Sequence, residues 1–384
     1  KVIGYDIDLK RINELRNGLD KTYEIQNNDL KYLLNIHFTS KRDDIKSANI
    51  FIVTVPTPID INNKPNLKPL ISASETVGKC IQNGDLIIYE STVYPGCTEE
   101  LCVPILEDKS GLSYNKDFFC GYSPERINPS DKIRKLTNIT KIVSGSNDEA
   151  LKTVDMLYSG IIKAGTFKVS SIKVAEAAKV IENVQRDVNI ALINEFAFIF
   201  DKLEINTSEV LSAASTKWNF LKFYPGLVGG HCIGVDPYYL THKAMEVGYH
   251  PEIILAGRKI NDNVGYYIAQ KTISKLVESK VNPSEAKVSI LGLTFKEDCP
   301  DLRNSKVLTI YQELKKFNCD IIFSDSVADE IEALEKYEIT LSSIEEIRNQ
   351  DALIIAVSHK EYTELSLSDF SHMLKPSGII IDVK

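Results

Sequence analysis

The sequence predicts an α/β protein in which two Rossmann-like domains with parallel sheets are joined by a long central helix and a helical middle domain. Three observations lead to this prediction. Short apolar runs alternate with amphipathic stretches over roughly the first 165 residues, a long stretch without Gly or Pro follows, and the alternation returns near residue 285. Strands that alternate with helices imply right-handed crossovers and a mostly parallel sheet.

The first domain is expected over residues 1–170. A helical pattern around 9–19 follows its first strand, and the glycine-rich loop that normally comes before such a strand is absent from these 384 residues. We therefore expect a first strand, a phosphate loop and a helix ahead of residue 1. The strands of this domain are predicted at 2–5, 49–55, 86–89, 118–122 and 141–144.

The middle domain is expected over residues 171–280. Apolar residues recur at helical spacing over 171–203, with Ser170 or Ser171 as the N-cap, which predicts one long helix. Further helices are predicted at 207–214 and 241–278, separated by a loop at 218–237 that is rich in Gly, Pro and aromatic residues.

The last domain is expected over residues 285–384 and repeats the α/β pattern of the first. A helix is predicted at 306–317. The strands are predicted at 287–293, 320–324, 352–357 and 378–382.

Composition excludes several classes of protein. Hydrophobic residues make up 43% and charged residues 26%, as in globular proteins, and the net charge of -8 argues against a nucleic-acid binder. Seven cysteines without a C-x-x-C pair indicate reduced thiols in the cytoplasm rather than disulfides or a structural metal. No apolar run approaches the ~18 residues that a membrane span needs.

Polar residues that follow the strands of the first domain are candidates for a binding site, because ligands of such sheets lie beyond the carboxyl ends of the strands. Asp6 ends the first strand, where an acid binds the ribose hydroxyls of NAD, and Arg11 could reach the adenosine end. Thr92 lies in Glu90–Gly96, which could equally be a simple turn. Glu125 could activate water and Arg126 could bind an anion, although both could also be solvated loop residues.

Later segments carry a second group of candidates. Lys179 and Asn183 lie one helical turn apart and could face an oxyanion, although a lysine on a long helix is usually a surface residue. Cys232 lies in the loop Gly229–Pro237, whose glycines and neighbouring His and Asp favour a nucleophile over a buried thiol. Lys296 and Arg303 follow a strand of the last domain and could reach a diphosphate or cofactor, or form a charged surface loop.

Seven segments in order resemble the nucleotide-sugar 6-dehydrogenase family, which oxidises UDP-glucose and UDP-N-acetylhexosamines. They are Y-D-I-D-x-x-R, V-P-T-P, E-S-T-V-x-P-G, S-P-E-R, K-V-I-E-N, G-G-H-C-I-G-V-D-P-Y-Y-L and G-L-T-F-K-E-D, and they cover nearly the whole chain. The His before the Cys and the D-P-Y-Y-L ending resemble the N-acetylhexosamine branch, especially the UDP-N-acetylglucosamine 6-dehydrogenases of capsular polysaccharide synthesis.

The resemblance implies a four-electron oxidation of the C6 hydroxyl to a uronic acid, through a thiohemiacetal and a thioester on Cys232. It implies oxyanion stabilisation by Lys179 and Asn183, and handling of protons and water by Glu125 and Asp236, with Thr92 placing the water. The NAD site implied is Asp6, Arg11, Thr57, Thr92 and Arg303. The UDP-sugar site implied is Arg126, Lys179, Asn183, Tyr224, Gly229, Lys296 and the loop Asn219–Tyr224, with the last domain holding UDP.

Other functions remain open from the sequence: a UDP-glucose 6-dehydrogenase, a single-step hydroxyacid dehydrogenase without thiol chemistry, and a nucleotide-sugar binding protein without turnover. A homodimer or higher homo-oligomer is expected by analogy, with the long middle helix as a plausible contact surface.

Overall fold

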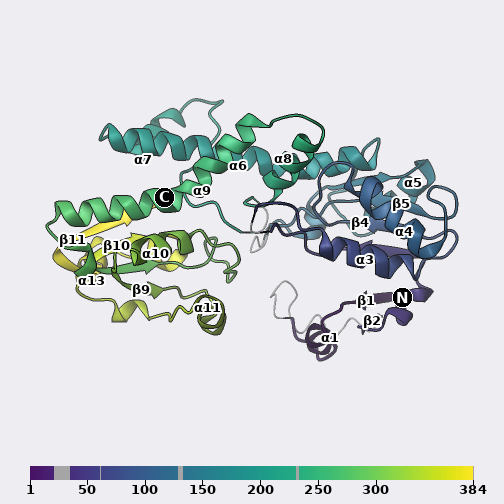
Figure 1. Ribbon diagram of the computed structural model, residues 1–384, viewed down its shortest axis with the longest axis horizontal. Coiled ribbons are helices and arrows are strands. Elements are labelled where there is room, and N and C mark those ends of the chain that lie inside the picture. The colour runs from purple at the N-terminus through teal and green to yellow at the C-terminus, as the bar shows by residue number, and fades with distance from the viewer. Residues whose placement is uncertain (21–34, 61, 129–132, 231–232, 384) are drawn as a thin grey trace. The chain divides into compact units, whose positions relative to one another are not determined.

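The computed structural model describes residues 1–20, 35–60, 62–128, 133–230 and 233–383 (Figure 1). The chain forms two compact units, residues 1–180 and 181–384. Their boundary falls within the long helix α6 (Ile172–Lys202). The three-domain division expected from the sequence stays a prediction.

The first unit holds two sheets. β1 (Val2–Tyr5) pairs in parallel with β2 (Ile36–Thr39). The second sheet has five strands in the order β3 (Ile50–Val53), β4 (Leu86–Tyr89), β5 (Phe119–Tyr122), β6 (Lys141–Gly145) and β7 (Thr166–Lys168). All its neighbours are parallel except β5 and β6. That exception puts the start of β6 beside the carboxyl end of β5.

Helices cover both faces of this five-stranded sheet. On one face, Leu86 and Ile88 of β4 pack against Val154 and Tyr158 of α5 (Asp148–Ser159). Toward the other face, the Tyr89 hydroxyl lies 2.8 Å from the Ser74 hydroxyl of α3 (Lys68–Gly78). The other helical segments of the unit are α1 (Leu9–Arg16), η1 (Arg42–Ser47), η2 (Thr98–Cys102), α4 (Val103–Ser110) and η3 (Leu136–Asn138).

The long predicted helix is confirmed as α6, and Ser171 is its N-cap because its hydroxyl accepts the Val174 N–H at 3.2 Å. α7 (Thr207–Ala214) is also confirmed. The single helix predicted over 241–278 is wrong, since two helices, α8 (Asp236–Glu246) and α9 (Glu252–Glu278), occupy this region. Gly248, with φ +82°, and Pro251 separate them.

The second unit ends in a four-stranded parallel sheet, ordered β11-β10-β8-β9. Its strands are β8 (Lys287–Leu291), β9 (Asp320–Ser324), β10 (Gln350–Ile355) and β11 (Leu374–Asp382). Its helical segments are η4 (Pro283–Glu285), α10 (Val307–Lys315), α11 (Glu330–Tyr337), η5 (Ile344–Glu346), α12 (Lys360–Thr363) and α13 (Leu367–Met373). The predicted class, two Rossmann-like parallel sheets with a helical middle region, is confirmed.

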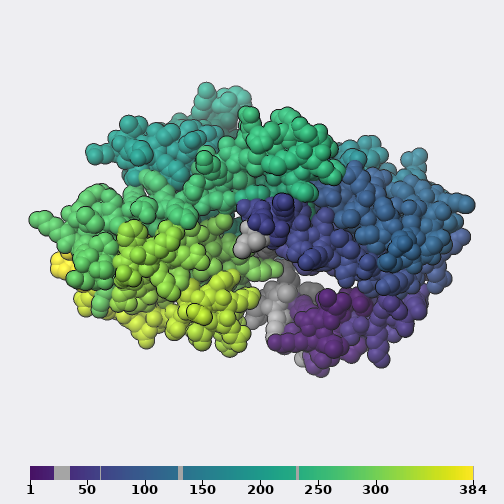
Figure 2. Space-filling model, viewed as in Figure 1, coloured from purple at the N-terminus to yellow at the C-terminus, as the bar shows by residue number. Residues whose placement is uncertain are grey.

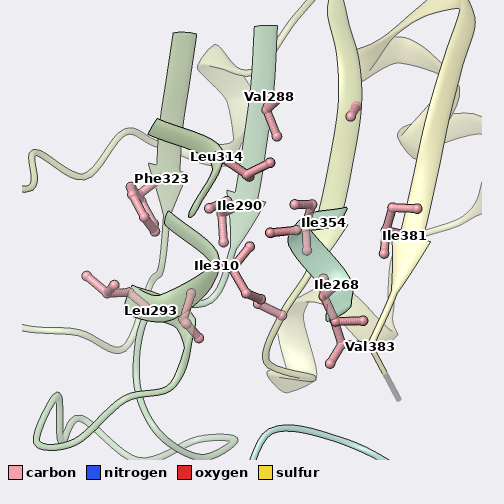
Figure 3. Packing of buried hydrophobic residues seen from close by; sticks show 14 of the residues in the cluster. Ile268, Val288, Ile290, Leu293, Ile310, Leu314, Phe323, Ile354, Ile381 and Val383 are labelled. Atoms are coloured by element: carbon pink, nitrogen blue, oxygen red, sulfur yellow. The ribbon is translucent and has the colours of Figure 1, made fainter. Parts of the chain in front are cut away.

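The core of this last sheet lies on both of its faces, as the near-continuous apolar strands require. Figure 3 shows Ile290 of β8 beside Ile310 of α10, and Ile268 of α9 near Ile354 of β10, within one buried cluster. On the opposite face Leu291 packs with Tyr362 and Met373. In the space-filling view, side chains fill the spaces between the ribbons of this sheet and its helices (Figure 2). Among the described residues, no helix combines the length and the hydropathy that a membrane span requires.

Candidate active site

The carboxyl edge of the five-stranded sheet carries most of the polar residues predicted for the first unit. Thr57 follows β3 and Thr92 follows β4, and both are half-buried. Between them, the Ser91 hydroxyl donates to the Val55 carbonyl at 2.6 Å, which ties together the loops after β3 and β4. The Tyr122 hydroxyl of β5 donates to the Ser91 carbonyl at 3.1 Å. The segments after three neighbouring strands are therefore bound to one another.

A buried lysine joins two carboxylates at this edge. Lys141, 3% exposed at the start of β6, lies with its Nζ 3.0 Å from Glu90 Oε2 and 3.4 Å from Glu125 Oε2. The Tyr158 hydroxyl donates to the other Glu90 oxygen, and burial followed by the charge of Glu90 raises the pKa of Tyr158. Sequence reasoning missed Lys141 and Tyr158. The sequence signal for Lys141 was its position as the first residue of a strand whose other residues are apolar or small.

Glu125 is oriented by the backbone as well as by Lys141. Its Oε1 accepts the N–H groups of Arg126 at 2.6 Å and of Ile127 at 2.7 Å. Such bonds fix the carboxylate in one direction. The Arg126 guanidinium donates to the Thr140 carbonyl at 2.8 Å, so this side chain points toward the start of β6. Both side chains are therefore held by hydrogen bonds to the backbone, and their roles in a site stay predictions.

The long helix is fastened to the loop that carries Thr92. Glu176 of α6 is completely buried, and its carboxylate accepts the N–H groups of Gly96 and Thr98, the latter at 2.9 Å. Burial raises the pKa of Glu176 to about 7, although these N–H bonds favour the carboxylate. Lys179, one turn further on, is 7% exposed, so it is not the surface lysine of the alternative interpretation. Glu176 is a third residue that sequence reasoning missed.

The first strand ends in a group whose chemistry fits NAD. Asp6 is exposed after β1, and its Oδ1 accepts the Asp8 N–H at 2.9 Å, which orients the carboxylate. An oriented carboxylate at this position can accept two hydrogen bonds from the vicinal hydroxyls of a ribose. Arg11 on α1 lies with its guanidinium 2.7 Å from Asp20, which is 3% exposed. The role of Arg11 at the adenosine end stays a prediction.

In the second unit, two of the predicted catalytic residues are in direct contact. The Asn183 side-chain amide on α6 donates to Asp236 Oδ2. Asp236 is 3% exposed and is the first residue of α8. Cys232 lies outside the described residues, four positions before Asp236 in the chain.

The glycine pair before the cysteine packs closely against the last sheet's loops. A Cβ on Gly229 would lie 2.6 Å from the Asn304 carbonyl oxygen, and one on Gly230 would lie 2.6 Å from the Phe295 ring. Gly230 also has φ +77°, and its N–H donates to the Asn304 carbonyl at 3.3 Å. The glycines therefore permit a close approach between two protein loops.

A buried polar network joins α6, α9 and the loop before the glycine pair, and sequence reasoning missed it. Arg258 of α9, 2% exposed, lies 2.7 Å from Asp187 of α6 and 2.6 Å from Asp262. Asn261 donates to Asp187 at 2.7 Å, and the Asn194 amide, which also binds Asn261, accepts the Gly226 N–H at 2.8 Å. The network thus fixes α6 relative to α9 and to the loop before the glycine pair. Its signal was Asp187 and Asn194, two polar residues seven positions apart in an apolar stripe.

The remaining predicted residues lie near the surface of the second unit. Tyr224 is 64% exposed and lines an open hollow with Leu211, Ser212, Ser215, Thr216 and Lys222. Lys296 is half-buried in the loop after β8. The Arg303 guanidinium is exposed and binds the Asp301 carboxylate at 2.6 Å. Among the described residues, no three His, Cys, Asp or Glu side chains gather as metal ligands would.

Three models of protein families match the chain, all from the UDP-glucose/GDP-mannose dehydrogenase family. The NAD binding domain matches residues 1–162, the central domain residues 173–263 and the UDP binding domain residues 289–384. Together these matches cover most of the chain.

Individual proteins are similar over the whole chain. Protein CapL of Staphylococcus aureus is 56% identical over 384 residues, which span 100% of this chain and 90% of CapL. UDP-N-acetyl-D-glucosamine 6-dehydrogenase of Salmonella typhi is 51% identical, with 100% and 90% covered. The solved structure of UDP-D-ManNAc dehydrogenase from Pyrococcus horikoshii has a TM-score of 0.89 at 30% identity and covers 100% of this chain and 89% of its own.

Proposed function

Because the chain belongs to the UDP-glucose/GDP-mannose dehydrogenase family and is an NAD-dependent nucleotide-sugar dehydrogenase, we propose that it oxidises UDP-N-acetyl-D-glucosamine at C6 to the uronic acid. The observation that carries the choice of sugar is the 51% identity over the whole chain to a protein named for this substrate and reaction. The resemblance of the segment Gly229–Leu240 to the N-acetylhexosamine branch supports the same choice.

Two successive oxidations at one carbon explain why a thiol is needed. The C6 alcohol first loses a hydride and a proton to give an aldehyde. The Cys232 sulfur then adds to the aldehyde carbon, and the thiol proton passes to the oxygen, giving a thiohemiacetal. Loss of a second hydride and proton gives a thioester, and water releases the carboxylate and the free thiol. NAD, when bound, supplies the acceptor for both hydrides.

The residues in contact on α6 and α8 have roles that suit this sequence of steps. Asp236 accepts the proton of the C6 hydroxyl, and the amide of Asn183 orients its carboxylate. Asn183 and the cation of Lys179 stabilise negative charge on the C6 oxygen.

The edge of the five-stranded sheet would manage water and the cofactor. Glu125, held by the N–H groups of Arg126 and Ile127, would take a proton from the water that attacks the thioester, and Thr92 would place that water. Asp6, Arg11, Thr57, Thr92 and Arg303 would hold NAD. Arg126, Tyr224, Gly229 and Lys296 would contact the UDP-sugar, whose diphosphate needs cations.

We further infer a setting for this reaction. The described cysteines Cys80, Cys97, Cys102, Cys120, Cys299 and Cys319 are all thiols, which suits the reducing cytoplasm. A homodimer or higher homo-oligomer is proposed from the family resemblance. The uronic acid product would supply surface polysaccharide synthesis, as the similarity to a protein named CapL supports.

A panel of UDP-sugars assayed for NADH tests the proposed function. UDP-N-acetylglucosamine should give the highest kcat/KM and two NADH for each sugar consumed. A higher kcat/KM for UDP-glucose would contradict UDP-N-acetylglucosamine as the substrate. One NADH per sugar would contradict the thiol mechanism and favour a single-step oxidation. If no UDP-sugar yields NADH, the remaining function is binding of a nucleotide-sugar without turnover.

A further inference from the structure

A buried histidine and a buried aspartate, which the proposed reaction does not use, form hydrogen bonds to the loop between β8 and α10. The loop segment Gly292–Asp298 carries Lys296, its one cation, and Phe295, which packs under the glycine pair. His359, 1% exposed, follows β10, and Asp325, 6% exposed, follows β9. Three neighbouring strand ends thus meet at this loop, since β8 lies between β9 and β10.

Asp325 binds the start of the loop. Its Oδ2 accepts the Leu293 N–H at 2.6 Å and the Thr294 N–H at 3.0 Å, while its Oδ1 accepts the N–H groups of Val327 and Ala328 at 2.9 Å each. Burial alone would raise the pKa of Asp325, but the bonds from His359 and from these backbone groups hold it well below its usual value. The carboxylate is therefore satisfied as an anion by donors and does not act as a base.

His359 bridges the two ends of the same loop. Its Nδ1 lies 3.0 Å from the Asp298 N–H, and its Nε2 lies 3.1 Å from both Asp325 Oδ2 and the Thr294 hydroxyl. A backbone N–H can only donate, so Nδ1 accepts and the ring proton sits on Nε2, directed at Asp325. The residues on either side of Lys296 are therefore attached to one rigid ring.

The attachment constrains the loop backbone. The Thr294 hydroxyl donates to the Lys296 carbonyl at 3.1 Å, and the Asp298 side chain accepts the Lys360 N–H at 3.0 Å. Asp298 has φ +53°, a left-handed conformation that costs free energy for a residue with a Cβ, although less for aspartate than for most. Without the ring, the loop would have fewer bonds to oppose this cost.

We propose that His359 and Asp325 are positioning residues for the UDP moiety, because they fix the loop that presents Phe295 and Lys296 to the diphosphate-bearing ligand. The inference rests on the proposed function only in that a UDP-sugar is the substrate. Both residues act through the loop, since their own polar atoms are already used within the protein.

Calorimetric titration of the full chain with UDP, and separately with NAD, tests this inference. His359→Phe and Asp325→Asn should each weaken UDP binding at least about tenfold, the size expected when a pre-organised site is loosened, and leave the Kd for NAD within about twofold. His359→Asn places an acceptor near the Nδ1 position and should regain part of the affinity through Asp298, whereas His359→Gln should regain only the bond to Asp325.

Asp351→Asn is the matched control. Asp351 is 5% exposed and lies near the amino end of β10, whereas the loop that carries Lys296 lies beyond the carboxyl ends of the strands. Its carboxylate accepts the Lys287 N–H at 2.9 Å and binds Lys375 at 2.7 Å. This variant should lower the melting temperature without changing the Kd for UDP. Equal weakening of UDP binding in Asp351→Asn would show a general loss of stability and overturn the inference.

UDP binding within twofold of the unaltered protein in both His359→Phe and Asp325→Asn would also overturn it. If His359→Phe does not fold, the comparison of His359→Asn with His359→Gln decides. The proposed function fails separately, when the unaltered chain binds UDP but forms no NADH from UDP-N-acetylglucosamine.

Discussion

Asp236 is the residue whose surroundings define its role most sharply, because a buried carboxylate at a helix start accepts a hydrogen bond from a second candidate, Asn183. Asp236→Asn keeps the shape and removes the base. We expect kcat to fall by about 100-fold or more, as for loss of a general base, with a small change in KM for the UDP-sugar. Steady-state NADH formation measures both constants.

Asp201→Asn serves as the control for that prediction. Asp201 lies near the end of the same helix and binds Lys271 and Tyr267. Its substitution should leave kcat unchanged. A kcat for Asp236→Asn close to that of the unaltered protein would remove Asp236 from the proton transfers.

Gly230 tests whether the glycine pair is needed for close packing. Alanine there meets φ +77° and a Cβ position 2.6 Å from the Phe295 ring. We expect a loss of about 2–4 kcal/mol in the free energy of unfolding, of which about 1–2 kcal/mol is the left-handed backbone and the rest is overpacking. Gly248→Ala, with φ +82° and open space around the Cβ, should show the backbone cost alone. Urea unfolding that gives equal losses for the two variants would contradict the packing argument.

The candidate site could be predicted from sequence where its residues are close in the chain or lie in recognisable segments. Lys179 and Asn183 are separated by one turn, and the Gly229–Pro237 segment carries its signal within nine positions. Lys141, Glu176 and Arg258 escaped notice because each has a partner about 50 to 80 residues away, in a segment that only folding brings close. Periodicity alone cannot distinguish such a buried charge from a surface one.

At the level of elements, the attachment of α6 to the Thr92 loop has a pH dependence. The pKa of Glu176 is about 7 in the folded chain against an ordinary 4.5, so the folded state holds this proton more tightly than the unfolded state. The contribution of Glu176 to stability is therefore complete below pH 4.5 and is lost as the pH rises through about 7. Its size is on the order of 3 kcal/mol.

Glu176→Gln should remove that dependence, because glutamine resembles the protonated acid. We expect the free energy of unfolding of the variant, minus that of the unaltered chain, to increase between pH 5 and pH 8, because only the unaltered chain loses this stability as the pH rises. Urea unfolding at several pH values gives this difference. A difference that stays constant over the range would mean that Glu176 is already ionised at pH 5.

Element boundaries were predictable to within a few residues wherever one signal dominated. The Ser171 cap defined the start of α6, and the strand 86–89 was predicted with its observed ends. The helix at 241–278 failed because its helical residues on either side of Gly248 and Pro251 were read as one stretch. The chain already contained both breakers, a glycine that reaches positive φ and a proline at the next N-cap.

On the scale of the whole molecule, the alternation of strands and helices was enough to predict two parallel sheets around a helical middle region. It could not predict the antiparallel pairing of β5 and β6, which places Lys141 beside Glu90 and Glu125. Strand direction depends on how a connection crosses the sheet, and the segment 123–140 between β5 and β6 gave no periodic signal.

Capture of the covalent intermediate tests the central claim most directly. The full chain, mixed with UDP-N-acetylglucosamine and excess NAD and quenched in acid during turnover, can be digested and its Cys232 peptide weighed by mass spectrometry. The account predicts a peptide heavier by the mass of the UDP-sugar less four hydrogens, the thioester left after two oxidations. An unmodified Cys232 peptide throughout turnover that yields uronic acid would contradict it.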